Sequence, residues 1–252
     1  MVKPVLLIRG DNNNADEDAL AKLGISSVVD PYIEISQAID PKSGASLLSQ
    51  LRSADAPLWL VATSTNALKF WSYIVGEDEL RAAVSARADL MFAAVGEGTG
   101  DALRAFGARH VFISSRATGK SLGEELVANY PTGCALIPGG NLALKTLPSI
   151  LLSAGWQVGT AVVYTTSPVA SEPPSARLVR DKEVGAILFR SPSAVRALTH
   201  FIPHPAVPLV CAGATTAQAL EAQGLKADVV ASMPSAEVVA STIYSLLCQE
   251  NI

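Results

Sequence analysis

Hydrophobic positions along the chain alternate between short apolar runs and longer segments with helical spacing. The short runs are typical of parallel strands that are covered on both faces, and the segments between them are typical of helices. The pattern predicts nine strands, at Val5–Ile8, Ser26–Val29, Leu58–Ala62, Met91–Val95, His110–Ile113, Ala135–Pro138, Ala186–Arg190, Pro208–Ala212 and Asp228–Ala231. This alternation indicates βα units built on parallel sheets.

Two segments of the chain resemble each other. Residues 96–107 align without gaps on residues 213–224, and each segment begins and ends with glycine. The final glycines, Gly107 and Gly224, are suited to the left-handed conformation that ends a helix. Upstream of the two segments, Ser64 and Ser191 each follow a predicted strand. The sequence therefore predicts an internal duplication and two similar α/β lobes.

Two extended segments, at residues 30–36 and 160–167, mark the points where the chain crosses between the lobes. Pro41 follows the first segment, and Pro168 directly follows the second. Because the chain crosses twice, one lobe is discontinuous. We expect one lobe at residues 1–35 plus 168–252 and the other at residues 36–167, with the extended segments paired as a two-stranded hinge ladder.

Composition narrows the class of function. The chain has 252 residues and a formal net charge of −4, so it provides no overall attraction for nucleic acid or an anionic membrane. No apolar run reaches the roughly 18–20 residues that a membrane-spanning helix needs, and no signal peptide is apparent. The three cysteines are far apart, which favours reduced thiols in a cytoplasmic protein. The three histidines lack the spacing of metal ligands, so we expect no metal site.

Short polar residues stand where predicted strands end and helices begin. Helix capping alone accounts for such residues. The same positions bind anions in doubly wound sheets, because helix N-termini there present free N–H groups. Six residues share this placement, namely Ser64, Thr99, Asn141, Ser191, Thr215 and Thr216. At any one turn capping is the favoured interpretation, but five such turns in two lobes favour a pocket for a ligand with many carboxylates.

Two further features follow predicted strands or lie in the hinge. Gly139 and Gly140 precede Asn141, and they indicate either a tight turn or a close approach of backbone to ligand. Tyr164 lies in the second extended segment beside two threonines. Its ring either packs in the core or presents a phenol between the lobes.

The order and spacing of these phrases resemble the uroporphyrinogen-III synthase family over nearly the whole chain. The resemblance rests on Leu6–Arg9, Pro31–Glu34, Thr63–Ala67, Val95–Thr99, Ile137–Asn141, Val163–Thr165, Phe189–Ser193, Gly213–Leu220 and Ser235–Ser241. One departure is visible, because Gly10–Asn14 follows Arg9 where the family often has proline.

The resemblance implies two flavodoxin-like parallel-sheet lobes joined by the ladder, with the substrate between them. It also implies a lyase of tetrapyrrole biosynthesis, the pathway to haem, sirohaem, chlorophyll and cobalamin. Such an enzyme closes the linear tetrapyrrole hydroxymethylbilane to uroporphyrinogen III, with loss of water, inversion of ring D and no cofactor. The expected partner is therefore this small molecule alone, and we expect a monomer.

The resemblance also implies roles for single residues. Tyr164 matches the hinge tyrosine that assists departure of the hydroxyl group. The matches to carboxylate-binding positions are Ser64, Thr99, Ser191, Thr215 and Thr216. Gly139, Gly140 and Asn141 match a loop that contacts the tetrapyrrole.

Two other classes of function fit the residues taken alone. A non-catalytic two-lobed protein that binds a small acidic ligand would use the same lobes, hinge and capped turns. A flavin-binding module would need aromatic residues that flank a phosphate loop. Fold analogy cannot decide between these classes.

Overall fold

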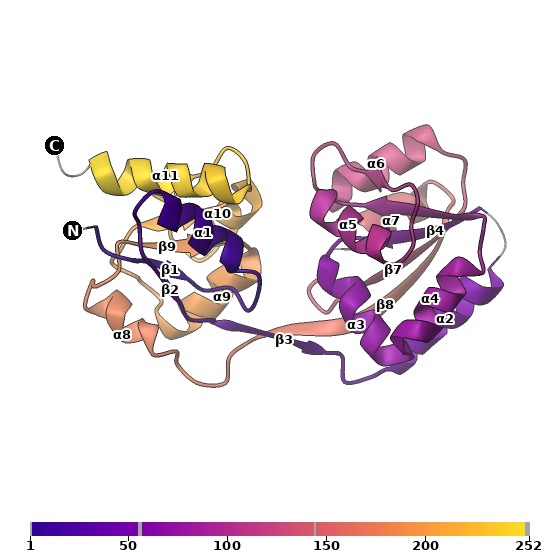
Figure 1. Cartoon of the computed structure of the whole chain (residues 1–252), viewed down its shortest axis with the longest axis horizontal. Helices are drawn as coiled ribbons and strands as arrows, with labels where there is room; N and C mark the ends of the chain where they lie inside the picture. Colours follow the sequence, from indigo (N-terminus) through magenta and orange to yellow (C-terminus); the bar gives the residue numbers. More distant parts are fainter. Residues whose placement is uncertain (1, 55–56, 144, 250–252) are drawn as a thin grey trace. The chain divides into compact units, whose positions relative to one another are not determined.

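The computed structural model describes residues 2–54, 57–143 and 145–249 and divides the chain into two compact units (Figure 1). The first unit comprises Met1–Ile35 and Ser167–Ile252, and the second comprises Ser36–Thr166. The chain passes between the units within β3 (Ile33–Gln37) and β8 (Gln157–Pro168), which are neighbours in one sheet.

The first unit contains a parallel sheet in the order β11-β10-β9-β1-β2. Its strands are β1 (Val5–Leu7), β2 (Ser27–Val29), β9 (Ala186–Phe189), β10 (Leu209–Cys211) and β11 (Val229–Val230). The helices are α1 (Asn14–Lys22), α8 (Ser175–Arg180), α9 (Pro192–Phe201), α10 (Ala214–Glu221) and α11 (Ala236–Gln249). Numbered along the chain within this unit, the order is 2-1-3-4-5, which is the flavodoxin order.

Alternate residues of β1 face different helix layers, as the two-residue period of a strand requires. Val5 and Leu7 pack with Leu20 of α1 and Ile243 of α11. Leu6 packs on the opposite face with residues of α8, α9 and α10. The sheet is therefore buried on both sides, which explains why its strands are continuous apolar runs.

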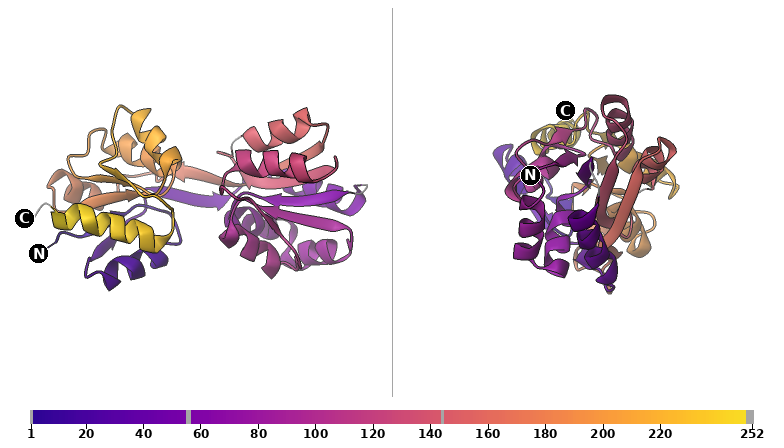
Figure 2. Two further views of the ribbon diagram at one scale, coloured as in Figure 1. Left: turned by 90° about the horizontal axis from the view of Figure 1, so that it is seen from above. Right: turned by 90° about the vertical axis from the view of Figure 1, so that its right-hand side faces the viewer.

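The second unit carries a six-stranded sheet in the described residues, in the order β3-β8-β7-β4-β5-β6. Its other strands are β4 (Leu58–Ala62), β5 (Leu90–Ala94), β6 (Phe112–Ile113) and β7 (Cys134–Gly140). The helices are α2 (Lys42–Ser53), α3 (Thr65–Val75), α4 (Glu77–Ser85), α5 (Glu97–Ala105), α6 (Gly119–Asn129) and α7 (Thr146–Ser153). Figure 2 shows α6 and α7 on one face of this sheet and α2 to α5 on the other.

The two sheets share one spatial arrangement with different connections. If β7 and β8 are matched to β1 and β2, then β4, β5 and β6 match β9, β10 and β11 in the same positions. Helix α6 packs on α7 in the second unit as α11 packs on α1 in the first. The α/β prediction is confirmed. The second unit is a circular permutation of the flavodoxin order, because the first of its five matched strands along the chain is β4.

The duplicated segments occupy matching places in the two units. Gly96 and Gly213 are extended residues immediately before α5 and α10. Leu103 and Leu220 are fully buried at equivalent positions of these helices. Gly107 and Gly224 then take positive φ values of 108° and 73°, so each ends its helix in the predicted left-handed conformation.

Candidate functional site

The carboxyl ends of parallel strands lie at one edge of each sheet, and the predicted site residues lie at these edges. In the second unit, Ser64 follows β4 and Thr99 follows β5. Gly139 and Gly140 end β7, and Asn141 comes directly after it. Tyr164 lies in the second half of β8. In the first unit Ser191 follows β9, and Thr215 and Thr216 follow β10. This edge is where doubly wound sheets bind ligands.

Tyr164 is held between Gly140 and Phe70. The register of β7 against β8 shifts between Gly139 and Gly140, and the shift places Gly140 opposite Tyr164. A Cβ atom at Gly140 would lie 2.5 Å from Cε2 of Tyr164, so only glycine accommodates the ring there. The ring stacks on Phe70 of α3, with centroids 5.8 Å apart and planes inclined by 29°. The phenol therefore has a fixed plane at the carboxyl end of the sheet.

Asn141 fixes the strand that carries Tyr164. Its backbone N–H donates to the carbonyl oxygen of Tyr164 at 3.1 Å. Its side-chain Oδ1 accepts from the N–H of Thr166 at 2.8 Å, and Nδ2 donates to the Thr166 carbonyl oxygen at 3.3 Å. The prediction that Asn141 begins a helix is wrong, because α7 starts only at Thr146 and the amide is used across the strands instead.

The two serines behave as predicted helix caps. Ser64 is extended, and its Oγ accepts a hydrogen bond of 3.2 Å from the N–H of Asn66 in α3. Ser191 is also extended, and its Oγ accepts from the N–H of Ala194 in α9 at 3.3 Å. The Ser64 hydroxyl keeps its own proton to donate. The Ser191 hydroxyl shares a hydrogen bond of 2.9 Å with the Ser193 hydroxyl, in which either oxygen can donate, so this pair of serines keeps one further proton. Capping and ligand binding are therefore compatible at these residues.

The threonines do not cap helices, which corrects the sequence prediction. Thr99 and Thr216 lie one turn inside α5 and α10 and are buried, and their N–H groups donate to the carbonyl oxygens of Gly96 and Gly213 at 3.1 Å. Thr215 lies in the same first turn as Thr216 but is exposed. The helices begin earlier than predicted because the preceding glycines are already extended.

Sequence reasoning missed an ion pair at the carboxyl edge of the first sheet. Arg190, directly after β9, makes two hydrogen bonds to the buried carboxylate of Asp16, including Nε to Oδ2 at 2.9 Å. Burial lowers the pKa of Arg9, the neighbouring Arg190 charge lowers it further, and Asp16 and Asp11 raise it. The sequence pattern could have indicated this ion pair. Asp16 lies three and four residues before Ala19 and Leu20, so helical spacing places its carboxylate on the buried face of α1, where a charge needs a partner.

Phe70 was also missed, because its helical spacing is that of an ordinary core residue. Only the packing of α3 beside β8 shows that its ring supports Tyr164.

Burial controls the ionisation of two of the cysteine thiols. Burial raises the pKa of Cys211 to about 12 and also raises the pKa of Cys134, so both thiols stay protonated near neutral pH.

No group of three or more His, Cys, Asp or Glu residues within residues 2–54, 57–143 and 145–249 is placed to hold a metal ion. None of the helices in those ranges is long and apolar enough to cross a membrane.

Comparison with known proteins gives one consistent family. The family model described as uroporphyrinogen-III synthase HemD matches residues 15–240. A crystal structure of mutant uroporphyrinogen III synthase from Thermus thermophilus is similar, with 18% identity, a TM-score of 0.63, and coverage of 98% of this chain and 100% of that chain.

A second solved structure has the same fold. Uroporphyrinogen-III synthetase from Helicobacter pylori is 17% identical, with a TM-score of 0.64 and coverage of 97% of this chain and 100% of that chain. Curated protein sequences give no match. At these identities the structural likeness shows the fold, and the family assignment comes from the family model.

Proposed function

Because this chain belongs to the uroporphyrinogen-III synthase family, a family of cyclising lyases, we propose that it closes hydroxymethylbilane to uroporphyrinogen III with Tyr164 assisting loss of water. The observation that carries this proposal is the fixed phenol of Tyr164, which Gly140, Phe70 and Asn141 together hold at the carboxyl end of the second sheet.

The reaction begins with loss of the terminal hydroxyl group. The phenol of Tyr164 donates a hydrogen bond to this oxygen, or a proton, so the group leaves as water. The substrate becomes an azafulvenium cation, and the terminal pyrrole attacks it through its substituted carbon to form a spiro intermediate. Rearrangement of this intermediate inverts ring D. The overall change is the loss of one water molecule, so no electron or group donor enters the balance and we expect no cofactor.

Carboxylate groups of the substrate need donors, and we propose that the strand-end turns supply them. The Ser64 hydroxyl has a proton to donate after capping α3, and the hydrogen-bonded hydroxyls of Ser191 and Ser193 together keep one proton to donate at the start of α9. The first N–H groups of a helix lack partners within the helix and favour anions. We propose that Thr215 contributes its exposed hydroxyl, and that the buried Thr99 and Thr216 hold the first turns of α5 and α10 in shape.

Local donors matter because the chain as a whole repels a polyanion. With a net charge of −4, the protein offers no long-range attraction to such a substrate. Holding the flexible substrate in one folded conformation is then the main catalytic task, since unguided closure gives the symmetric type I isomer.

The proposal is tested with freshly prepared hydroxymethylbilane. After incubation the products are oxidised and the porphyrin isomers are separated. We expect the type III isomer to dominate, and to form faster than the type I isomer forms in buffer alone. Type I product at the spontaneous rate would contradict the enzymatic function, and binding of the substrate without a change in isomer would identify a non-catalytic binding protein.

We also propose that the protein acts as a monomer in the cytoplasm. The widely spaced cysteines and the buried thiols of Cys134 and Cys211 support a reducing compartment. Light scattering coupled to size-exclusion chromatography should give the 26.2 kDa of one chain, and a mass of twice this value would overturn the monomer. Fractionation of cells should recover the protein with cytoplasmic markers.

A further inference from the structure

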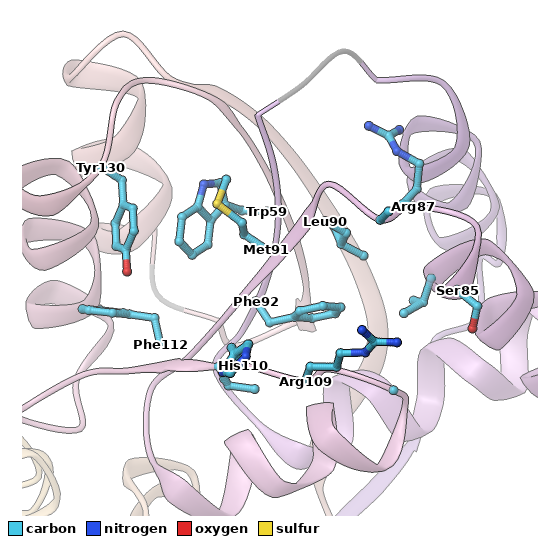
Figure 3. A pocket seen from close by; sticks show the side chains of 14 residues that line it. Trp59, Ser85, Arg87, Leu90, Met91, Phe92, Arg109, His110, Phe112 and Tyr130 are labelled. Atoms are coloured by element: carbon cyan, nitrogen blue, oxygen red, sulfur yellow. The ribbon is translucent and has the colours of Figure 1, made fainter.

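A cavity of about 740 Å³ opens at the amino-terminal edge of the second sheet (Figure 3). Three of its lining residues lie at the beginnings of strands. Trp59 is the second residue of β4, Met91 is the second residue of β5, and Phe112 is the first residue of β6. Tyr130, directly after α6, also lines it. The proposed catalytic residues lie at the opposite, carboxyl edge, roughly 15 Å away along a five-residue strand such as β4. The cavity is therefore separate from the strand-end turns.

Aromatic rings form one wall of this cavity. Tyr130 packs edge-on against Trp59, with ring centroids 4.6 Å apart, and against Phe112 at 5.6 Å. Figure 3 shows Phe92 between these rings and Arg109. Rings that are fixed by each other present a rigid apolar surface, and a volume of this size is typical of a small-molecule site.

One charged group at the cavity has no ion-pair partner in the described part of the protein. Arg109 lines the cavity and is exposed, and no carboxylate of the described residues lies within ion-pair distance of it. By contrast, the nearby Arg87 is bound to Asp89 and to two backbone carbonyls. A cation thus accompanies the aromatic wall.

We propose that this cavity binds a planar aromatic carboxylate. Arg109 binds the carboxylate, and the aromatic wall of Trp59, Phe112 and Tyr130 contacts the aromatic plane. A charged donor beside an apolar wall selects an anion that carries an apolar ring.

The test uses 6-hydroxy-2-naphthoate as probe and the indole N–H signals of the intact protein in ¹H–¹⁵N NMR spectra. The chain has three tryptophans, and Trp59→Phe identifies the signal of Trp59. Trp71 is an internal reference, because its Nε1 already donates to the Gly44 carbonyl oxygen at 2.9 Å. We expect a saturable shift of the Trp59 signal and a constant Trp71 signal.

Two comparisons test the role of charge. Arg109→Gln should weaken probe binding about tenfold or more, the effect of one charge-assisted hydrogen bond. Arg196→Gln, which removes an exposed guanidinium from α9 in the other unit, should leave binding unchanged. Naphthalen-2-ol, which lacks the carboxylate, should bind more weakly by a similar factor and be insensitive to Arg109→Gln.

Three results would overturn the proposal. One is the absence of a saturable Trp59 shift at probe concentrations up to about 5 mM. Another is equal binding of the naphthoate and the neutral naphthol. The third is competition between the probe and turnover of hydroxymethylbilane, which would place the probe at the catalytic site. Unchanged probe binding in Tyr164→Phe would support a separate site, whatever the outcome for the proposed enzymatic function.

Discussion

Gly140 and Tyr164 face each other across two neighbouring strands, and the tyrosine ring occupies the space that a Cβ atom at Gly140 would need. Gly140→Ala should therefore displace the ring and lower kcat at least about tenfold, the loss that follows when a catalytic group is moved out of position. Overpacking should also cost about 1–3 kcal/mol of unfolding free energy. Steady-state kinetics and urea unfolding measure the two effects.

Gly119→Ala is the matched control for this substitution. A Cβ atom at Gly119 meets Leu147 Cβ at 3.6 Å, which is ordinary contact, and the residue begins α6. We expect wild-type kcat and a small gain in stability, since alanine favours helix. Equal kcat in Gly140→Ala and Gly119→Ala would show that the fixed ring position does not matter.

Tyr164→Phe tests the phenol itself. Without the hydroxyl, assistance to the leaving group is lost, and kcat should fall by about 10²-fold or more. Folding should be little affected, because the ring and its contact with Phe70 remain. Tyr73→Phe, at an exposed position of α3, is the control and should leave kinetics unchanged. Unchanged turnover in Tyr164→Phe would remove the assignment.

The cysteines differ in their expected reactivity. Burial raises the pKa of Cys211 from 9.0 to about 12, whereas Cys248 is only half-buried. Iodoacetamide at pH 8 should label Cys248 in the native protein and Cys211 only after unfolding, as mass spectrometry would show. The unfolded Cys211 thiol ionises near pH 9, whereas the folded thiol ionises only near pH 12. The free energy of unfolding should therefore be unaffected by this thiol below pH 9 and should fall as the pH rises from 9 to 12. Labelling of Cys211 in the native state would contradict its burial.

Helices α5 and α10 show how the duplicated sequence is used at the level of elements. Each begins after an extended glycine and ends at a glycine with positive φ. Gly107→Ala and Gly224→Ala should each cost about 1–2 kcal/mol, because a Cβ atom is strained at positive φ although space is available. Gly98→Ala, which is equally unobstructed and lacks a positive φ, should cost nothing in urea unfolding. Unequal costs at Gly107 and Gly224 would contradict the equivalence of the two helices.

The whole molecule consists of two units with separate cores, and its tryptophans report on only one of them. Trp59, Trp71 and Trp156 all belong to the second unit. Tryptophan fluorescence therefore follows unfolding of the second unit, whereas far-UV circular dichroism follows helices of both.

This distribution allows a test of independent unfolding. Asp16→Ala leaves Arg190 without its carboxylate in the first unit and should cost about 3–5 kcal/mol there. In urea, the circular dichroism transition should move to lower concentration while the fluorescence transition stays in place. Asp18→Ala, at an exposed position of the same helix, should move neither. A joint shift of both transitions would show that the units unfold together.

Local sequence signals anticipated the elements and many of the turns. Ser64 and Ser191 cap their helices as predicted, and all nine predicted strands are present with small changes at their ends. Capping and strand burial depend on residues within a few positions of each other, so the sequence reveals them. The family resemblance was also readable, because it rests on the order and spacing of short phrases, and the family model confirms it.

The sequence by itself therefore determined the α/β class, the turns that carry the polar residues and the family. Only the tertiary structure decided the circular permutation of the second unit, the use of Asn141 as a link between strands, and the ion pair of Arg190 with Asp16. It also decided that the ring of Tyr164 rests between Gly140 and Phe70. These features join residues far apart in the chain, and such contacts depend on strand order and register, which local patterns do not encode.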